Sequence, residues 1–597
     1  ANTYNDTQVD KISGVLGLNY EFLEHFSAET RFQFNYSEVA GKVFSPEVFY
    51  GSGKVFNVTR NNVNEFQNIF RDYTWDTFVT YKNQFGDDHN LTVLLGMSVF
   101  QATGRFSGAT GFDLPSNSYE DARLENAEEV VDNYINGGDI YDTRLLSYFT
   151  RVQYDYKGRY LFSALIRRDG STRFGPENRF GYFPSFSAGW IMSEESFLYD
   201  SSWLDFLKLR VSYGIVGNDR IPDYGYVSLL NGEGTYVFDD ELVFGVAEGA
   251  LANPEIQWEK QKTFDVGFDM NFLDNKFRVT ADYFKKETED LLLVPQVSGI
   301  LGSSAPGSRP PIVNAGSVTN EGFEFQIGYQ NQISDNFNLN ISYNFTYLDN
   351  VVTDVAGENG FVTGGSFGVG QDPPSRMEVG RPIGYFYGLE TDGIFQNQQE
   401  VDAHAEQVNA APGDLRFVDQ NNDGVIDEDD RTYIGDPIAP ITMGLNLVMN
   451  YKTWDFGAYF FSSLNNEVVR NYERNQNLTN RSVYFLNRWT GEGTTDSFPR
   501  VTTGANSNGL FSDFYVEDGS YVRLQNVQLG YSLPDATIRS MGIDKLRFYL
   551  SVNNAYTWTK YKGYDPSATS GEPIGGGIDQ GFYPLPRTYM LGLNLKF

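Results

Sequence analysis

The residues best suited to chemistry lie in the acidic segment Asp419–Asp430, which reads DQNNDGVIDEDD. Side-chain oxygens stand at positions 1, 3 and 5 of this segment, Gly424 at position 6 and a carboxylate at position 12, which is the spacing of a calcium loop. A hard cation needs six or more oxygens at short range, and the glycine permits the turn that brings them together. We therefore predict Ca²⁺ as the candidate cofactor, with these ligands: Asp419, Asn421, Asp423, the Val425 carbonyl, Asp427 (directly or through water) and Asp430.

The closing residue of this segment weakens the prediction. Asp430 has a shorter side chain than the glutamate usual at position 12, so a modest affinity is expected. Helices that would flank such a loop are not evident in the sequence on either side. The alternative is a metal-free loop of Asn, Asp and Gly that is held by its own side-chain hydrogen bonds.

The segment Gly364–Gly368 (GGSFG) matches the pattern of a serine-hydrolase nucleophile elbow. An elbow needs a strand before the serine and a helix after it, and we expect neither in this glycine-rich loop. The chain has no Cys, and its three His, which are His25, His89 and His404, lie far from Ser366 in sequence. These His also lack the spacing of a zinc site. The sequence therefore predicts no catalytic residue and no enzyme.

Aromatic residues in the expected outward loops offer a second kind of chemistry. Such rings stack on sugars or hold peptide side chains in a binding cavity, but they also pack loops together. Packing is the better interpretation for any single residue in a chain this rich in Tyr and Phe, so no substrate contact is assigned. The residues concerned are Tyr236, Phe244, Phe361, Phe367 and Trp489.

The elements that must carry these loops show period-two alternation in segments of roughly ten residues, typical of transmembrane strands. In Phe337–Tyr347, apolar and aromatic residues alternate with Asn, Ser and Thr. The segment Phe323–Tyr329 alternates in the same way and is joined to it by a polar turn, Ser334–Asn336. This pattern predicts a hairpin with one apolar face and one polar face, the polar face lining a wet interior.

Further hairpins and long connections follow along the chain. We count roughly seventeen strands, although strand boundaries are uncertain in such a reading. The hairpins are Phe264–Phe272 with Phe277–Phe284, which turn at Asp274 and Asn275, and Tyr148–Tyr156 with Tyr160–Ile166, which turn at Lys157 and Gly158. The long loops, rich in Gly, Pro, Asn and Asp, are Pro295–Ser317, Val351–Arg381, Leu389–Asp436 and Ser567–Pro586.

Composition favours the same class. The 597 residues include 48 Phe and 39 Tyr and carry a formal net charge of −33. Rings with a polar tip suit a membrane interface, and the acidic surplus argues against a nucleic-acid partner. No run of about 18 apolar residues occurs, which excludes a spanning helix and leaves a closed barrel. The last strand, Tyr589–Phe597, ends on Phe, like the signal that directs the assembly of many outer-membrane barrels.

Several segments in a fixed order resemble the TonB-dependent outer-membrane transporters of the SusC/RagA type, and the resemblance runs from Ile12 to Phe597. It implies an all-β fold, a large antiparallel transmembrane β-barrel of about 22 strands when complete, with long extracellular loops. Residues 1–597 would form the C-terminal part of that barrel, with the signal peptide, plug domain and first strands upstream of residue 1. The segments are Tyr154–Trp190, Leu207–Asn218, Asn253–Phe284, Gly380–Asn397, Glu517–Pro534 and Tyr561–Ala568.

The function implied by this resemblance is active import of a bulky nutrient, an oligosaccharide or a peptide, across the outer membrane. The implied partners are a SusD-like lipoprotein lid, the TonB complex acting through the plug, the lipid bilayer with its lipopolysaccharide, and a second barrel-lid pair in a dimer. Three alternatives remain open at this point. They are a passive porin or secretion-associated scaffold, an outer-membrane enzyme with its site at the barrel mouth, and a soluble β-rich adhesin.

Overall fold

The computed structural model describes residues 3–54, 57–229, 232–243, 245–247, 249, 251–294, 310–356, 360–368, 370–473, 481–538, 542–571 and 573–597. The chain divides into two compact units. Unit 1 comprises residues 1–188, 214–259 and 298–313, and unit 2 comprises residues 189–213, 260–297 and 314–597. Among the described residues, no helix has the length and apolar character needed to cross a membrane.

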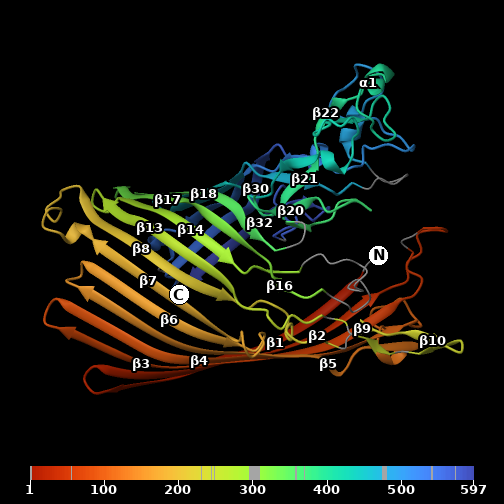
Figure 1. Ribbon diagram of the computed structural model, residues 1–597. Coiled ribbons are helices and arrows are strands. Elements are labelled where there is room, and N and C mark those ends of the chain that lie inside the picture. Colours follow the sequence, from red (N-terminus) through yellow and green to blue (C-terminus); the bar gives the residue numbers. More distant parts are fainter. Residues whose placement is uncertain are drawn as a thin grey trace. The chain divides into compact units, whose positions relative to one another are not determined.

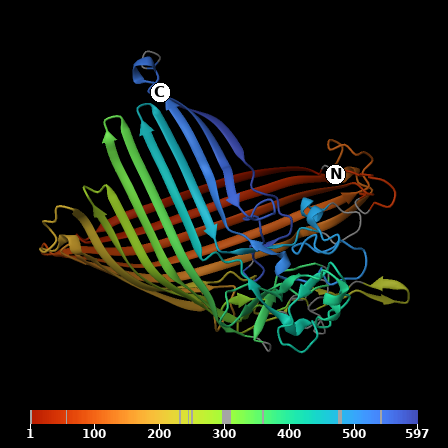
Figure 2. The same ribbon diagram turned by 90° about the horizontal axis from the view of Figure 1, so that it is seen from above.

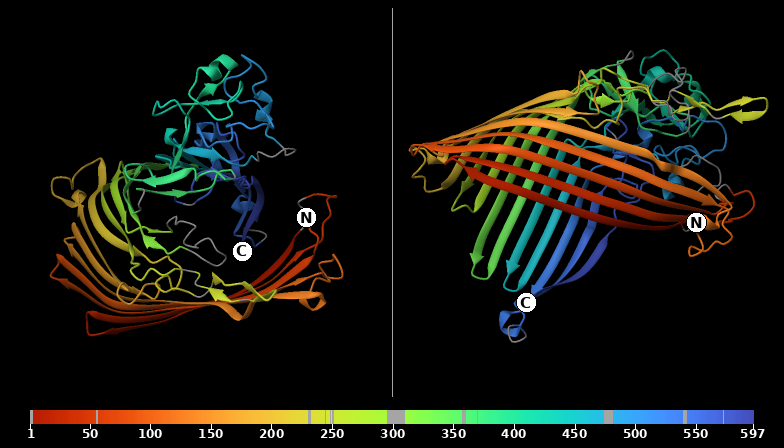
Figure 3. Two further views of the ribbon diagram at one scale, coloured as in Figure 1. Left: turned by 45° about the vertical axis from the view of Figure 1, so that its right-hand side comes forward. Right: turned by 90° about the horizontal axis from the view of Figure 1, so that it is seen from below.

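Unit 1 is built on long antiparallel strands joined in chain order (Figures 1 and 3). Each of the first four strands pairs with the next one, and the fifth pairs with the sixth, in registers that run with few breaks. Tight three-residue turns alternate with longer connections; Leu23 and Lys157 take a left-handed backbone conformation in two of the tight turns. The strands are β1 (Tyr4–Phe22), β2 (Phe26–Ser45), β3 (Asn62–Phe85), β4 (His89–Phe112), β5 (Glu129–Tyr156) and β6 (Tyr160–Ser171). Two more strands, β7 (Phe180–Ile191) and β8 (Leu204–Asn218), belong partly to each unit.

Unit 2 continues the same design with shorter strands, which lie side by side as hairpins in Figure 2. Successive strands pair antiparallel from β13 through to β32. The strands are β13 (Glu259–Phe272), β14 (Phe277–Glu289), β17 (Gly316–Ser334), β18 (Phe337–Val355), β25 (Ile441–Tyr451), β26 (Trp454–Leu464), β29 (Tyr521–Ser532), β30 (Lys545–Thr559) and β32 (Thr588–Lys596).

The strands predicted from alternation are confirmed. The three predicted hairpins pair antiparallel, with Phe325 opposite Phe345 and Tyr148 opposite Arg168, for example. Within the described part of the chain, seventeen strands belong to the main sheet, as counted from sequence. The loop limits were partly wrong, because β17 begins at Gly316 and β18 runs to Val355. These ends lack clean alternation, so the sequence pattern alone could not extend the strands to them.

The two faces of the unit 2 ladder differ as predicted, because directly paired residues of neighbouring strands share a face. On one face Phe325 lies opposite Phe345, and Phe345 lies opposite Met443. On the other face Gln326 pairs with Asn344. The apolar face is exposed over a wide area, with Phe323 56%, Tyr347 42% and Leu591 84% accessible. A face this apolar is suited to lipid rather than to water.

Aromatic pairs lie on this apolar face, at the strand ends that tight turns connect. Phe277 packs against Phe272 at 5.1 Å and against Tyr329 at 4.8 Å between ring centroids. Trp454 packs against Tyr531 at 4.7 Å. Such rows of rings mark the membrane interface of outer-membrane barrels.

The segments between the long strands contain short strands of two to five residues and short helices. In unit 1 these are β9 (Gly232–Glu233), β10 (Tyr236–Phe238), β11 (Glu241–Val243) and β12 (Val246–Ala247); β15 (Leu292–Leu293) and β16 (Val313–Asn314) pair with each other. In unit 2 they are β19 (Phe361–Gly364), β20 (Ser375–Glu378), β21 (Tyr385–Leu389), β22 (Thr391–Ile394), β23 (Leu415–Phe417), β24 (Arg431–Gly435), β27 (Glu467–Arg470), β28 (Val516–Asp518) and β31 (Ile578–Asp579), with α1 (Gln398–Asp402) and α2 (Asp535–Ile538).

Candidate functional site

The polar face of the unit 2 ladder is the first candidate functional surface. Amides and hydroxyls of successive strands meet there; for example, Gln326 donates to Ser342 at 3.4 Å and Asn526 donates to Asn553 at 2.6 Å. Short polar side chains of this kind hydrogen-bond equally well to water or to a polar solute. The face can therefore line an aqueous path, while the opposite face meets lipid.

Charged side chains on this face are grouped around arginines. Arg210 of β8 makes ion pairs with Asp282 at 2.7 Å, Asp269 at 3.1 Å and Asp265 at 3.5 Å. One guanidinium among three carboxylates leaves a surplus of negative charge, fixed in place by the strands. The sequence analysis missed this group, because its members come from three strands and only the pairing register shows that they share a face.

A second candidate is the loop module, defined here as residues 356–440, 465–520 and 560–587 of unit 2, where described. Three small sheets order it, β19-β20-β21-β24, β22-β23 and β28-β27-β31, and β20, β21, β22 and α1 are visible in Figure 1. Two apolar clusters hold it together. One contains Phe367, Phe386, Val469, Phe511 and Ile578, and the other contains Leu389, Ile394, Leu415, Phe417 and Ile426.

A buried polar network crosslinks the loop module. Asp414 is fully buried and accepts hydrogen bonds from Arg500 Nε at 2.7 Å and Nη2 at 2.9 Å. Asn508 donates to the same carboxylate at 2.8 Å, and its own carbonyl oxygen accepts from Leu415 N. The hydrogen bonds that Arg500 donates to Asp414 raise the pKa of the Arg500 guanidinium. The network joins segments far apart in sequence and makes them one folded unit.

Elsewhere in the loop module, burial raises the pKa of carboxyl groups. This holds for Asp436 and Glu467, which lie together: Glu467 accepts from Asp436 N at 3.0 Å. Burial likewise raises the pKa of Asp513, although hydrogen bonds from Thr391 oppose the shift. None of these carboxylates stands beside a nucleophile and a base, so the arrangement supports structure rather than catalysis.

The predicted calcium ligands lie in one loop between β23 and β24, and Gly424 has the expected left-handed backbone with φ of +90°. Asp419 accepts a hydrogen bond from Gly424 N at 2.9 Å, and Asp423 accepts one from Val425 N at 2.9 Å. Asn421 accepts from Asp423 N at 2.9 Å, so all three side chains point into the loop. These bonds shape the loop without a metal, as the alternative interpretation required.

The fit to a cation is mixed. The second carboxylate oxygen of Asp419 is buried without a hydrogen-bond partner, which suits a ligand. Asp430, which is fully buried, instead accepts from Gln420 N at 2.8 Å and from Asp427 N at 2.9 Å, so both of its oxygens are already engaged. Among the described residues, no group of three or more His, Cys, Asp or Glu is placed to hold a metal ion. Calcium binding at this loop stays a prediction.

The serine of the elbow pattern is not a nucleophile. A short strand, β19, does precede Ser366, which corrects the expectation that none would; the following residue, Phe367, enters the apolar cluster and is 6% exposed. The Ser366 hydroxyl accepts a hydrogen bond from the Gln580 amide at 3.0 Å, and its backbone carbonyl accepts one from the Asn471 amide at 2.9 Å.

Three of the four described loop aromatics, Phe361, Phe367 and Trp489, pack within the loop module, whereas Tyr236 does not follow the packing interpretation. Phe361 covers the Arg376 guanidinium at 4.1 Å, and Trp489 donates to Gln396 at 3.2 Å within the module. Tyr236 is 64% exposed, and Phe244 lies outside the described residues.

Long antiparallel strands with one lipid-suited face, aromatic rings at the turn ends and a polar opposite face define the class of protein as an outer-membrane β-barrel chain. The particular family follows from comparison. Residues 1–555 match the family described as TonB dependent receptor-like, beta-barrel, and the chain belongs to that family.

Its relatives include members of the SusC/RagA type. TonB-dependent receptor P3 of Formosa agariphila is 32% identical over 601 residues, covering 97% of this chain and 57% of the relative. TonB-dependent receptor SusC of Bacteroides thetaiotaomicron is 31% identical over 539 residues, covering 88% of this chain and 50% of SusC. The structure of the RagAB peptide transporter has the same fold, with a TM-score of 0.83 at 22% identity over 100% of this chain and 62% of that one.

These relationships confirm the predicted fold class, the resemblance to SusC/RagA-type members and the outer-membrane location. They also agree with the prediction that the chain is not an enzyme, because the family and the relatives compared by sequence are described as TonB-dependent receptors. The chain spans 50% to 57% of the length of the two relatives compared by sequence.

Proposed function

We propose that this chain is the barrel of an active importer that takes a bulky nutrient, an oligosaccharide or a peptide, across the outer membrane. The observation that carries the proposal is the 31% identity to TonB-dependent receptor SusC over 88% of the chain. The polar face supports it, because a wide barrel with a polar interior conducts or encloses hydrophilic solutes.

The partners belong to the same proposal. A SusD-like lipoprotein closes the barrel from outside, and the TonB complex supplies energy through a plug domain that lies upstream of residue 1 in the complete protein. The apolar face meets the bilayer and its lipopolysaccharide. Two barrel-lid pairs associate as a dimer. The loop module, ordered by its own small sheets and apolar clusters, is the part of this chain that meets the lid and the solute.

The test is to tag the protein in its native host, extract the outer membrane in mild detergent, and measure the intact mass of every co-purifying chain. We expect a barrel chain much heavier than 67.4 kDa together with a surface lipoprotein in equal amount. A barrel chain of this mass, alone and without a plug fragment, contradicts active import and favours a passive porin or a scaffold.

We further propose that the Asp419–Asp430 loop takes up Ca²⁺ with modest affinity. The support is the ligand spacing, the left-handed Gly424 and the unpartnered oxygen of Asp419. The cation would add to the stability of a loop that its own hydrogen bonds already shape.

A further inference from the structure

Unit 1 has an outward face as apolar as that of unit 2. Leu16 stands opposite Phe32, and Phe32 stands opposite Trp75, so these side chains share one face of the sheet. Leu16 is 68% exposed and Trp75 is 50% exposed, which suits lipid rather than water. Each of the strands β2, β3 and β4 is paired on both sides, so this exposure does not arise from the ends of the chain.

Aromatic rings bound the outward face of unit 1 at two levels. Near the tight turns Phe26 packs against Tyr81 at 4.9 Å between ring centroids, and further along the same strands Phe32 packs against Tyr73 at 5.8 Å. The strand from Tyr81 to Arg71 rises about 33 Å, which is about 25 Å along the membrane normal at a tilt of about 40°. The apolar band of an outer-membrane barrel is about 25 Å tall. Arg71 therefore lies at the far edge of this band.

Arg105 of β4 lies beside Arg71 at the same edge. It stands opposite Ile69, two positions from Arg71, so the two arginines are diagonal neighbours about 7–8 Å apart on the outward face. Both are exposed, and we call them the arginine pair. β3 and β4 are joined at their other end by the tight turn 86–88, whereas the longer connections 46–61 and 113–128 leave from this end. Since the short turns of outer-membrane barrels face the periplasm, the arginine pair lies in the outer leaflet.

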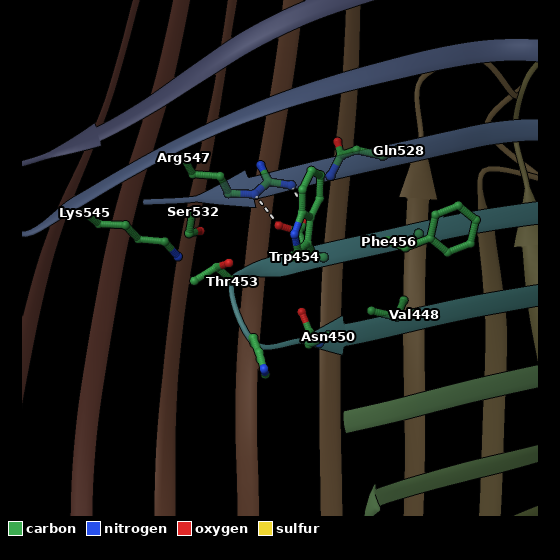
Figure 4. A pocket seen from close by; sticks show the side chains of 12 residues that line it. Val448, Asn450, Thr453, Trp454, Phe456, Gln528, Ser532, Lys545 and Arg547 are labelled. Carbon is green, nitrogen blue, oxygen red and sulfur yellow. Dashed lines mark hydrogen bonds and ion pairs between the residues drawn. The ribbon is translucent and has the colours of Figure 1, made fainter. Parts of the chain in front are cut away.

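Other cations of the strands are neutralised by carboxylates. On the inward face of unit 2, Arg547 donates from Nε to Asp455 at 2.8 Å (Figure 4). On the outward face of the same unit, Lys285 pairs with Glu287 at 2.7 Å. The arginine pair forms no ion pair with any residue whose side chain the structure describes. The Arg71 guanidinium instead lies over an aromatic ring at 5.8 Å from its centre.

The carboxylates of the neighbouring strands on this face are already engaged. Glu38 of β2 accepts hydrogen bonds from the Tyr36 hydroxyl at 3.0 Å and from the Gln67 amide at 2.5 Å. Asp142 of β5 accepts one from Arg144 at 2.6 Å. A chain with a net charge of −33 thus keeps two adjacent guanidinium groups available at the outer edge of its lipid-facing band.

We propose that the arginine pair binds a phosphate group of lipopolysaccharide in the outer leaflet. The inference deepens the lipid contact of the proposed function, because it assigns residues to that contact. A guanidinium donates two parallel hydrogen bonds to a phosphate, and basic side chains at a membrane surface are attracted to anionic lipid head groups. The acyl chains of the same lipid would lie along the apolar band, against Trp75 and Leu95, which is 66% exposed.

The position of the arginine pair favours a lipid over a soluble anion. A solute inside the barrel is separated from the pair by the sheet itself, because the pair lies on the opposite face. A free phosphate in the medium would contact the guanidinium groups alone, whereas a lipid would also bury acyl chains against the band. A single arginine at an interface can simply extend its head group into water, but two neighbouring guanidinium groups repel each other unless an anion lies between them.

The test is native mass spectrometry of the full-length protein extracted from its native outer membrane in mild detergent. We expect each folded chain to retain lipopolysaccharide. The double substitution Arg71→Gln with Arg105→Gln should lower the retained fraction at least about tenfold. Lipopolysaccharide added back to stripped protein should bind, whereas the same lipid without its phosphates should not. An excess of inorganic phosphate should not displace the bound lipid.

Lys285→Gln is the matched control. Lys285 stands one outward position beyond Tyr283, just as Arg71 stands beyond Tyr73, but it already has a carboxylate partner. This change should leave lipid retention unaltered. The heat-modifiable fraction on gels checks that each variant is inserted. If the double variant does not insert, Arg105→Gln alone should lower retention about fivefold.

Three results would overturn the proposal. They are retention that ignores the arginine substitutions or the lipid phosphates, an equal loss in the lysine control, and displacement of the lipid by inorganic phosphate. A chain that arrives without a plug contradicts active import instead, and the lipid measurement still decides whether the arginine pair binds lipopolysaccharide.

Discussion

Replacement of Asp414 by Asn tests whether the loop module is held by its buried network. Asp414 is fully buried, and its carboxylate receives two hydrogen bonds from Arg500 and one each from Asn508 and Ala411 N. An asparagine side chain has one acceptor oxygen, and it places an amide against the guanidinium. Breaking a buried ion pair costs about 3–5 kcal/mol. Because the Arg500 side chain remains 27% exposed and can be rehydrated, we expect a loss of about 2–3 kcal/mol.

The assay is hydrogen exchange with mass spectrometry on peptides that span residues 411–417 of the protein in detergent. A loss of about 2–3 kcal/mol corresponds to roughly 30- to 150-fold faster exchange, since each 1.4 kcal/mol is tenfold. Asp392→Asn is the matched control: Asp392 also pairs with an arginine of the module, Arg416, at 3.0 Å, but its side chain is 70% exposed. That change should have less than about a fivefold effect. Equal effects of the two substitutions would refute the reasoning that burial decides the contribution.

Three further predictions concern the membrane face, pH and calcium. Leu445→Arg on the apolar face of β25 should cost about 2–4 kcal/mol of membrane stability, whereas Asn446→Arg on the polar face should be tolerated; the fraction of heat-modifiable, inserted protein on gels measures both. Burial raises the pKa of the Glu467 carboxyl above its usual 4.5, so the folded module binds this proton more tightly than the unfolded chain. Its stability is therefore greatest below the unfolded value and falls as pH rises through the raised folded value; Glu467→Gln should weaken this dependence in hydrogen exchange measured over a pH series. Ca²⁺ should raise the melting temperature of the loop module, and Asp423→Ala should abolish the rise; an equal response of both proteins would rule out the loop as the site.

Sequence alone predicted the long strands because their signal is local. Between Phe337 and Tyr347 the alternation of apolar and polar residues indicates which face of the sheet each side chain lies on. The register with the neighbouring strand follows from the tight turn that joins the two strands. The short strands of the loop module carry no such signal. β27 and β31 have four and two residues and pair across more than a hundred intervening positions, so neither alternation nor turn residues indicate them.

The same limit applied to the candidate sites. The calcium prediction needed one contiguous segment, whereas the Asp414–Arg500 pair joins residues 86 positions apart. Lys545 and Lys596 likewise become neighbours only once β30 and β32 are paired. Side chains brought together by long-range pairing can be recognised only after the register is known.

The sheet β28-β27-β31 has a consequence for how such proteins diversify. β27 pairs antiparallel with β28 of the same connection and parallel with β31 of another, so two connections share one set of backbone hydrogen bonds. Recombination that exchanged a single connection between homologous genes would leave unpaired strand edges in the recipient. New specificities would therefore arise either by point substitution at exposed positions or by joint inheritance of both segments. Designed chimaeras of this chain should follow the same rule and move residues 465–520 and 560–587 together.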